Sequence, residues 1–474
     1  MNTNWMPDLA RYPGPKFLGL SRALRDAVRD GTLQPGTRLP TVRDLAFRLG
    51  ATPGTVARAY QLATQEGLLA ATVGRGTFVA AAHPRLGPTQ PLFSDRHLSA
   101  TGTLVDLRAP LLPEVGQAGA FAGALSAIAG AIPERLPLGG GTDWIDYTSQ
   151  RAEGPLRQAA AEWLADRALG PVAADDVALT QGGQNGIALV LLCCLRGERP
   201  VVLTEDLAYP GFRHAARLAR AEVVGVEIDE HGIVPDALEA ACRRHGPQVL
   251  CLTVDAQNPT TVRMPGDRRA RVVAIARAFD LQVIEDDCYS VAAATLPALR
   301  ALAPERVWHV GGWSKTISAA LRFGYVVCPP GMGEALRLTA QHSFFALSRP
   351  LSDLCLHLLS SGAAARLRAA TQAEMGLRLE TMVARLGARR IGWQPGLPFL
   401  WIPLPSGWRA STFAREAEAQ GVLLRSADEY ALIHGRAPHA VRLAVNGAIP
   451  RDDLDAAVGR LAALLDRPPA EIAV

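Results

Sequence analysis

The spacing of apolar residues near the N-terminus predicts three short helices followed by a β-hairpin. We expect helices at 17–29, 42–49 and 54–66, and strands at 68–72 and 77–79. A Gly-Arg-Gly turn separates the two strands, which is typical of a hairpin. This order of helices, turn and hairpin is that of a winged helix-turn-helix, and we expect such a domain over residues 1–80.

The remainder of the chain shows a different pattern. Periodicity is lost over 81–104, where Pro84, Pro88 and Pro91 predict a linker. Short β-rich runs then alternate with Ala- and Arg-rich helical stretches, which predicts a mostly parallel sheet covered by helices. We expect its strands at 177–180, 201–203, 222–226, 249–254, 282–285, 307–310 and 324–328.

Beyond residue 356 the pattern changes to long helices followed by three short strands. These strands are expected at 399–403, 422–424 and 441–445. The fold class is therefore α/β, with a large domain over 105–356 and a smaller α+β domain over 357–474 behind the winged helix.

Composition and charge limit the possible partners and compartments. The chain has 474 residues and a formal net charge of +4, so any affinity for DNA must come from a local basic surface. Seven cysteines without a Cys-x-x-Cys pair do not indicate a metal site or a disulfide framework. We expect a cytoplasmic protein without a membrane partner, because no signal peptide is visible and the uncharged stretch 116–133 is typical of a packed helix.

Several arginines of the N-terminal region are placed to contact DNA. The helix after the turn would enter the major groove with Thr55 and Arg58 facing the bases. Arg38 and Arg43 would neutralise phosphates, and Arg75, between two glycines, would enter a minor groove. The alternative for each arginine is an ordinary solvated surface charge.

The combined motif is more specific than any one arginine. The segment resembles the GntR-type winged-helix domain, which implies binding to double-stranded promoter DNA. The matching positions are Leu39-Pro40, Arg43, Leu45-Ala46, Thr55-Val56, Ala59-Tyr60, Gly67 and Gly76-Thr77. Pro53 departs from the polar or basic residue of many relatives, which puts a base contact at that position in doubt.

A second set of residues indicates chemistry with an aldehyde cofactor. Lys315 follows Ser314 just after a predicted strand, where a lysine can form a Schiff base. Arg322 follows closely and could hold a phosphate through two hydrogen bonds. Taken alone, a lysine is more often a surface charge, and such an arginine is more often part of a surface ion pair.

Three further motifs lie at predicted strand ends. Asp286 in "VIEDDCYS" could pair with a protonated ring nitrogen, and Tyr289 and Asn258 could hydrogen-bond the phenolic oxygen of the ring. Gly183 and Gln184 in "TQGGQNG" open a helix whose free N–H groups can hold phosphate. Each motif also has a more ordinary explanation. The acidic pair that contains Asp286 is more often a helix cap or a metal ligand, an Asn-Pro pair is usually a turn, and the glycines can belong to an ordinary loop.

The order and spacing of these motifs resemble a fold-type I aminotransferase of class I/II over residues 105–465. The resemblance implies pyridoxal 5′-phosphate on Lys315, with Tyr209 stacked on its ring. It also implies that Arg442 in "AVRLAVN" binds a substrate α-carboxylate. Tyr147 resembles the tyrosine that reaches the phosphate in the partner subunit's site, which implies a homodimer.

Two positions depart from the aminotransferase pattern. Thr261 replaces the usual glycine of an Asn-Pro-Thr-Gly motif, and Gly312 stands where a hydroxyl residue often contacts phosphate. Both departures weaken the expectation of efficient turnover more than the expectation of cofactor binding.

A GntR-type domain joined to an aminotransferase-like domain is the arrangement of the MocR group of regulators. We therefore expect a transcription regulator that senses the cofactor or its adduct with a small amino compound or amino acid. An active aminotransferase with an appended DNA-binding domain is the alternative. A domain that kept the fold but lost the cofactor is disfavoured, because the motif residues of the site are intact.

Overall fold

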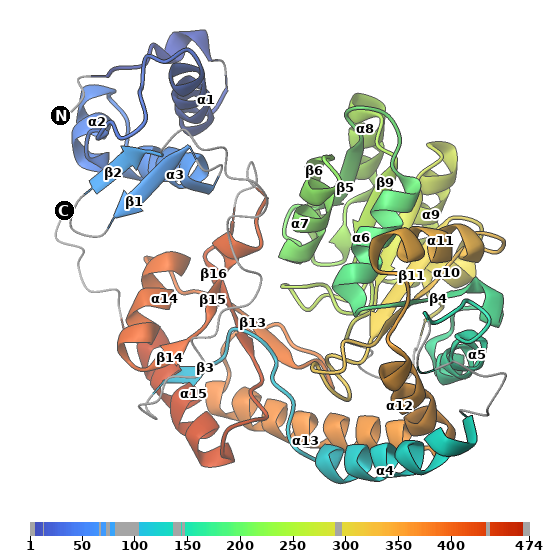
Figure 1. The fold of residues 1–474 in the computed structure, drawn as a ribbon. Helices are drawn as coiled ribbons and strands as arrows, with labels where there is room; N and C mark the ends of the chain where they lie inside the picture. The colour runs from blue at the N-terminus through green and yellow to red at the C-terminus, as the bar shows by residue number, and fades with distance from the viewer. Residues whose placement is uncertain are drawn as a thin grey trace. The chain divides into compact units, whose positions relative to one another are not determined.

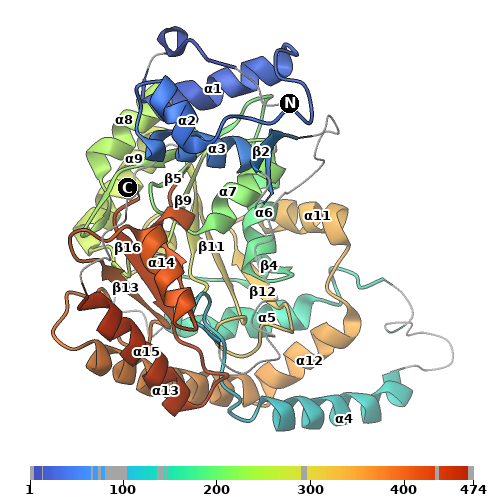
Figure 2. The ribbon, with the colours of Figure 1, turned by 90° about the vertical axis from the view of Figure 1, so that its left-hand side faces the viewer.

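The computed structural model describes residues 5–12, 14–65, 68–72, 76–80, 104–135, 144, 147–289, 296–432 and 437–467. The chain forms two compact units, Met1–Ser94 and Asp95–Val474. Both units are drawn in Figures 1 and 2, with the N-terminal unit in blue.

The N-terminal unit has the predicted winged helix-turn-helix order. Its elements are η1 (Leu9–Arg11), α1 (Lys16–Arg29), α2 (Val42–Arg48), α3 (Pro53–Gln65), β1 (Leu69–Thr72) and β2 (Gly76–Val79). Thr41 begins α2, because its side chain accepts a hydrogen bond from the Asp44 N–H. The three helices and the antiparallel hairpin enclose an apolar core that includes Leu24, Leu45 and Val56.

A seven-stranded sheet forms the centre of the second unit. In spatial order its strands are β4 (Val177–Thr180), β12 (Gly324–Val327), β11 (Val307–Gly312), β10 (Gln282–Asp286), β9 (Val249–Leu252), β5 (Val201–Glu205) and β6 (Glu222–Val226). The predicted, mostly parallel sheet is confirmed, and β12 is antiparallel to both of its neighbours. All residues of β4, β9, β11 and β12 are buried, as expected for a sheet covered on both faces.

Helices cover this sheet, as Figure 1 shows. One core joins the sheet to α6 (Gly183–Cys194), α7 (Pro210–Leu218) and α11 (Gly333–Phe344). Another joins it to α8 (Pro235–His245), α9 (Gly266–Ala278) and α10 (Leu299–Leu302). The outer elements are α4 (Gln117–Arg135), α5 (Gly154–Trp163), η3 (Ala165–Arg167), η4 (Ala174–Asp176) and α12 (Arg349–Ser360), with the short pair β7 (Ile228–Asp229) and β8 (Gly232–Ile233).

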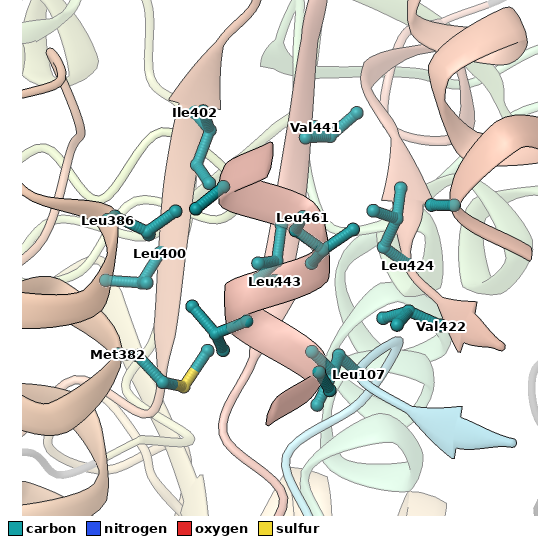
Figure 3. Packing of buried hydrophobic residues seen from close by; sticks show 14 of the residues in the cluster. Leu107, Met382, Leu386, Leu400, Ile402, Val422, Leu424, Val441, Leu443 and Leu461 are labelled. Atoms are coloured by element: carbon teal, nitrogen blue, oxygen red, sulfur yellow. The ribbon is translucent and has the colours of Figure 1, made fainter. Parts of the chain in front are cut away.

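The C-terminal part of this unit carries a smaller sheet with helices against it. Its order is β13 (Phe399–Pro403), β16 (Ala440–Ala444) and β15 (Arg425–Ser426). The helices are α13 (Ala363–Leu386), α14 (Ala410–Ala419) and α15 (Arg451–Leu465), and η5 (Ala427–Glu429) follows β15. Their apolar side chains form one cluster, in which Leu443 and Leu461 lie close together (Figure 3).

The boundary expected at residue 105 differs from the structure. The short strand β3 (Val105–Asp106) pairs in parallel with β14 (Val422–Leu423), and Leu107 lies in the C-terminal cluster (Figure 3). The start of this unit therefore packs with its end. The pairing joins residues more than three hundred positions apart, which local periodicity cannot reveal.

The uncharged stretch expected to pack as a helix does form α4, but much of its surface is exposed. Gln117, Ala124 and Ile128 are buried, whereas Leu125 is 51% exposed. Most of the other described positions on α4 are small residues that also face outward. No helix in the described part of the chain is long and apolar enough to cross a membrane.

Leu443 provides a test of the C-terminal core. Replacing it with alanine removes a fully buried side chain, and we expect the free energy of unfolding to fall by about 2–5 kcal/mol. Leu377→Ala on α13 is the control, because Leu377 is 50% exposed and its loss should change stability by less than about 0.5 kcal/mol. Equal urea-unfolding midpoints for the two variants would contradict this assignment of the core.

Candidate functional site

The candidate site lies where four parallel strands end. β5, β9, β10 and β11 run in the same direction, so their carboxyl ends meet at one edge of the sheet. Tyr209, Asn258 and Lys315 lie in the segments that follow β5, β9 and β11, and Asp286 is the last residue of β10. The fold thus places at one edge four side chains that the sequence separates by more than one hundred positions.

Lys315 is one of only two lysines in the whole sequence, the other being Lys16 in the N-terminal unit. Its Nζ atom donates a hydrogen bond to the carbonyl oxygen of Pro110 at 3.3 Å. Burial lowers the pKa of this amine to about 8, with further lowering by the positive charges of Arg442 and Arg322. A neutral fraction is therefore present near neutral pH, and neutral amines attack aldehydes.

A hydrogen-bonded group connects Arg442, Asn258 and Tyr289. Arg442 on β16 donates from Nη1 to Asn258 Oδ1 at 2.8 Å and from Nη2 to the Arg108 carbonyl oxygen at 3.0 Å. Asn258 Nδ2 in turn donates to the Tyr289 hydroxyl at 3.3 Å. Arg442 is 4% exposed, and no carboxylate of the described residues lies within ion-pair distance of it. A buried guanidinium without a counter-charge is suited to binding an anion.

Asp286 presents the opposite situation, a buried carboxylate without a cation. It accepts a hydrogen bond from the Cys288 N–H at 3.1 Å, and no basic side chain in the described part of the chain forms an ion pair with it. Burial raises the pKa of Asp286 to about 7, and the adjacent negative charge of Asp287 acts in the same direction. A cation placed against this carboxylate would stabilise its ionised form.

Arg322 and a glycine turn form a cradle at the start of α6. The Arg322 guanidinium donates to Ser314 Oγ at 3.2 Å and to the Gln181 carbonyl oxygen at 3.1 Å. Gly182 has a φ of +84°, and a Cβ atom there would lie 2.5 Å from Arg322 Nη2. Gly183 begins the helix, so its free N–H groups and the guanidinium share one location. This combination is suited to a phosphate.

Tyr209 and Gln184 are packed against a second glycine. Tyr209 directly precedes α7, and Gln184 Nε2 donates to the Gly211 carbonyl oxygen at 3.0 Å. A Cβ atom at Gly211 would overlap both Gln184 Oε1 and the Tyr209 ring. Glycine at this position therefore allows the tyrosine ring to lie beside the start of α6.

The two departures from the aminotransferase pattern have local structural counterparts. A Cβ atom at Gly312 would lie 3.0 Å from the Phe323 carbonyl oxygen, so a hydroxyl side chain would require the neighbouring strand to shift. Thr261 adopts a φ of +69°, a left-handed conformation that glycine adopts more easily. The backbone thus keeps a glycine-like conformation at Thr261.

Tyr147 does not contact the other predicted site residues of its own chain. Its ring is 81% exposed and stacks on Phe345, with 5.0 Å between the ring centroids. Phe345 is itself 62% exposed.

Sequence reasoning missed a second arginine beside Arg442. Arg425 on β15 is the cross-strand Cα partner of Arg442, and its Nε donates at 3.1 Å to the same Arg108 carbonyl oxygen. Its guanidinium also pairs with Glu429. No local motif marks Arg425, because its position depends on the register between two short strands.

The arginines that are predicted to contact DNA differ in how far they are exposed to solvent. Arg43 is exposed on α2, and Arg38 is half-buried with its guanidinium against Gly76. Arg75 lies outside the described residues.

On α3, Thr55 and Arg58 each contact another residue of the N-terminal unit. The Thr55 and Thr52 hydroxyls are hydrogen-bonded at 2.9 Å. The Arg58 guanidinium lies over the Phe17 ring of α1, 4.2 Å from the ring centroid. Arg58 thus packs on α1 through its guanidinium group, a contact that helical spacing alone did not indicate.

Two family models match the chain. The model described as "Aminotransferase class I and II" matches residues 118–461, and the model described as "Bacterial regulatory proteins, gntR family" matches residues 19–79. The first range contains the strand-end site, and the second contains most of α1 together with α2, α3 and the hairpin.

Several relatives share most of the chain. The HTH-type transcriptional regulator TauR of Rhodobacter capsulatus is 30% identical over 85% of this chain and 87% of its own length. The HTH-type pyridoxine biosynthesis transcriptional regulator PdxR of Corynebacterium glutamicum is 29% identical over 72% of this chain and 71% of its own. The 2-aminoadipate transaminase of Thermus thermophilus is 31% identical over 59% of this chain and 71% of its own.

Solved structures resemble the second unit. LysN, the α-aminoadipate aminotransferase of Thermus thermophilus, has a TM-score of 0.63 and 25% identity, covering 77% of this chain and 92% of LysN. An archaeal alanine:glyoxylate aminotransferase has a TM-score of 0.65 at 22% identity, covering 76% of this chain and 90% of that protein, which supports the fold alone. The aminotransferase fold implies dependence on pyridoxal 5′-phosphate.

The two matched regions occur in one chain, with the GntR-type region first. The chain therefore belongs to the class I and II aminotransferase family and, through its N-terminal GntR-type domain, to the MocR group of transcription regulators.

Proposed function

We propose that this DNA-binding regulator binds pyridoxal 5′-phosphate at Lys315 and responds to an amino acid that joins the cofactor there. The observation that carries the proposal is a set of charges around Lys315 without ionic partners among the described residues. These are the carboxylate of Asp286 and the guanidinium groups of Arg322 and Arg442. Their signs match the ring nitrogen, the phosphate and a ligand carboxylate, respectively.

The residues present fit the cofactor. Asp286 would face its protonated ring nitrogen, while Ser314, Gly183 and Arg322 would hold its phosphate. Tyr209 would stack on the ring, and Asn258 and Tyr289 would donate hydrogen bonds to its phenolic oxygen. When bound, the cofactor supplies an aldehyde that combines with amines and a ring that withdraws electrons.

Recognition of an α-carboxylate is assigned to Arg442. The low exposure of Arg442 and its contacts with Phe399 and Tyr430 give the guanidinium a partly apolar surrounding, in which a carboxylate would be held strongly. The ligand class is therefore an amino compound that carries an acidic group. The names of TauR and PdxR as transcription regulators support a regulatory role for this binding.

The protein is proposed to act as a homodimer. Tyr147 is exposed in the single chain, and α4 presents an uncharged surface of small residues with Leu125 among them. Apolar surface of this kind is typical of an interface. In the dimer Tyr147 would complete the phosphate site of the partner subunit, and two winged helices would read promoter DNA.

Active transamination is the second candidate function. The similarity to the 2-aminoadipate transaminase of Thermus thermophilus favours it, as does the presence of the lysine and its cofactor-facing partners. The two functions differ in an observable way, because an enzyme turns over an amino acid and a 2-oxo acid many times, whereas a regulator changes its DNA affinity.

Lys315→Ala should abolish covalent attachment of the cofactor. In the wild type, borohydride should fix the cofactor to the peptide that contains Lys315, and the rate of attachment should rise as pH passes through about 8, where the amine loses its proton. Lys16→Ala is the matched control, because it removes the other lysine of the chain. A reducible visible band that persists in Lys315→Ala would contradict the assignment.

Arg43→Ala should weaken binding to promoter DNA by about 1–3 kcal/mol if Arg43 contacts bases. A phosphate contact would instead lower the salt slope by about one and weaken all sequences alike. We expect a loss for Arg58→Ala as well, measured together with thermal unfolding because Arg58 also packs on Phe17. Arg415→Ala on α14 is the control. If Arg43→Ala and Arg58→Ala both bind promoter DNA like the wild type, the expected placement of these helices on DNA is wrong.

Cofactor and amino acid together should change operator affinity by roughly 5–150-fold, the usual range for coupled sites. The measurement is operator binding with pyridoxal 5′-phosphate alone, and then with amino acids or their decarboxylated amines. Lys315→Ala should remove the response, and Arg442→Ala should remove the preference for acids over amines. Equal DNA affinities in every condition, together with rapid multiple turnover, would favour the enzyme instead.

A further inference from the structure

Two arginines on neighbouring strands of the small sheet share one hydrogen-bond acceptor. Arg425 on β15 lies directly opposite Arg442 on β16, so both side chains project from the same face of the sheet. Arg442 Nη2 donates to the Arg108 carbonyl oxygen at 3.0 Å, and Arg425 Nε donates to the same oxygen at 3.1 Å. Burial is the main cause of the lowered pKa of Lys315, and the positive charge of Arg425 lowers it further. The fold therefore places a second cation at the candidate site, beside the one assigned to an α-carboxylate.

Glu429 is the carboxylate that pairs with Arg425. It lies four residues along the chain, in η5, and its Oε2 atom accepts a hydrogen bond from Arg425 Nη1. The arginine side chain is 27% exposed and the glutamate side chain 41% exposed. Solvent competes for a pair exposed to this degree, which makes the pair easy to exchange. The other terminal nitrogen of Arg425, Nη2, donates to no residue in the described part of the chain, so Arg425 has room for a further acceptor.

The charged groups around this pair leave an excess of positive charge. Arg213 on α7 donates to the carbonyl oxygens of Ala431 at 2.9 Å and Glu429 at 3.0 Å. Burial lowers the pKa of Arg213, Glu429 opposes this effect, and the positive charge of Arg425 adds to it. Among the described residues, no carboxylate lies within ion-pair distance of Arg213 or Arg442. Three guanidinium groups thus face one carboxylate.

The guanidinium of Arg108 does not change this balance, because it has a carboxylate of its own. Arg108 Nη2 lies 2.6 Å from Asp106 Oδ2. Glu429 and Glu418 also act on Arg108. Glu418 and Asp428 are exposed, so solvent screens their charges. A ligand with one carboxylate would neutralise only part of the excess, whereas a ligand with two carboxylates would neutralise it.

We propose that Arg425 is a specificity-determining residue that binds the second carboxylate of a short dicarboxylic amino acid, whose α-carboxylate is bound by Arg442. This inference rests on the proposed function, because it names the class of amino acid that would join the cofactor at Lys315. A guanidinium offers a carboxylate a pair of parallel N–H groups, so two arginines match two carboxylates. Arg442 has donor capacity for its share, because its Nε atom is buried without a hydrogen-bond partner among the described residues.

The shared acceptor limits the length of this ligand. Both guanidinium groups contact the Arg108 carbonyl oxygen, so carboxylates bound to them would lie close together. Aspartate and glutamate carry their two carboxylates on a short carbon chain. Asparagine and glutamine have nearly the same shape but carry a neutral amide in place of the second carboxylate. A site that uses Arg425 in this way distinguishes each acid from its amide, because hydrogen bonds to charged groups are the stronger ones.

The test compares these acids and amides as ligands of the full-length protein loaded with pyridoxal 5′-phosphate. Binding is followed through the visible absorption of the cofactor, which reports affinity without requiring turnover. The wild type should bind glutamate or aspartate more tightly than the corresponding amide. Arg425→Gln should weaken binding of the preferred acid by roughly tenfold or more and change the affinity for its amide by less than about twofold.

Glu429→Gln should have the opposite effect, because it removes the carboxylate that competes with the ligand for Arg425. The acid should bind more tightly and its amide as before. Arg425→Lys keeps a positive charge and should restore part of the preference that Arg425→Gln loses. Arg415→Gln, at an exposed position on α14, is the matched control and should change neither affinity. If Arg425→Gln does not fold, Glu429→Gln decides the question.

Equal affinities of the wild type for each acid and its amide would overturn the inference. An equal loss for acid and amide in Arg425→Gln would do the same, since it shows a merely structural role, and so would an unchanged acid affinity in Glu429→Gln. The proposed function survives these results as long as amino acids still change the cofactor spectrum and Arg442→Ala weakens their binding. A wild type that binds no pyridoxal 5′-phosphate, or whose cofactor responds to no amino acid, would overturn the proposed function itself, and the inference with it.

Discussion

The candidate site depends on one constraint, the common direction of four neighbouring strands. Parallel strands require long crossover connections, and these carry the helices that bury both faces of the sheet. The same arrangement gathers the carboxyl ends of β5, β9, β10 and β11 at one edge. Side chains at that edge can contact a ligand because the strands end there, whereas the strand interiors are buried between the helices. Tyr209, Asn258, Asp286 and Lys315 are neighbours for this reason.

Much of this arrangement could be predicted because its signals are local. Apolar runs marked the strands, and chemical residue types marked their ends. Contacts set by strand register or by packing across the fold could not be predicted in this way. Arg425 faces Arg442 only because β15 and β16 pair in a particular register, and β3 joins β14 across most of the unit. The stacking of Arg58 on Phe17 likewise depends on how two helices cross.

The two lysines of the chain illustrate how composition can identify a site. Among its 49 basic residues only Lys16 and Lys315 are lysines, so the remaining positive charges are guanidinium groups. Arginine forms ion pairs and hydrogen bonds as lysine does, but it stays protonated and does not serve as an amine nucleophile. A reactive amine is the one property that arginine cannot supply. Lysine at position 315 would thus meet the chemical requirement of the proposed cofactor attachment, and burial lowers the pKa of its amine.

Under the proposed function, Arg442 would connect ligand binding to the conformation of the second unit. It belongs to the small sheet through β16, yet it donates to Asn258 beside the large sheet and to the Arg108 carbonyl oxygen after β3. A ligand carboxylate would compete with these acceptors for the same guanidinium nitrogens. Binding would therefore change the contacts that hold the small sheet against the large one, and it would favour whichever arrangement offers the carboxylate the better geometry. An amine without the acidic group has no such preference, so the differential contact on Arg442 is what would make an amino acid a signal as well as a ligand.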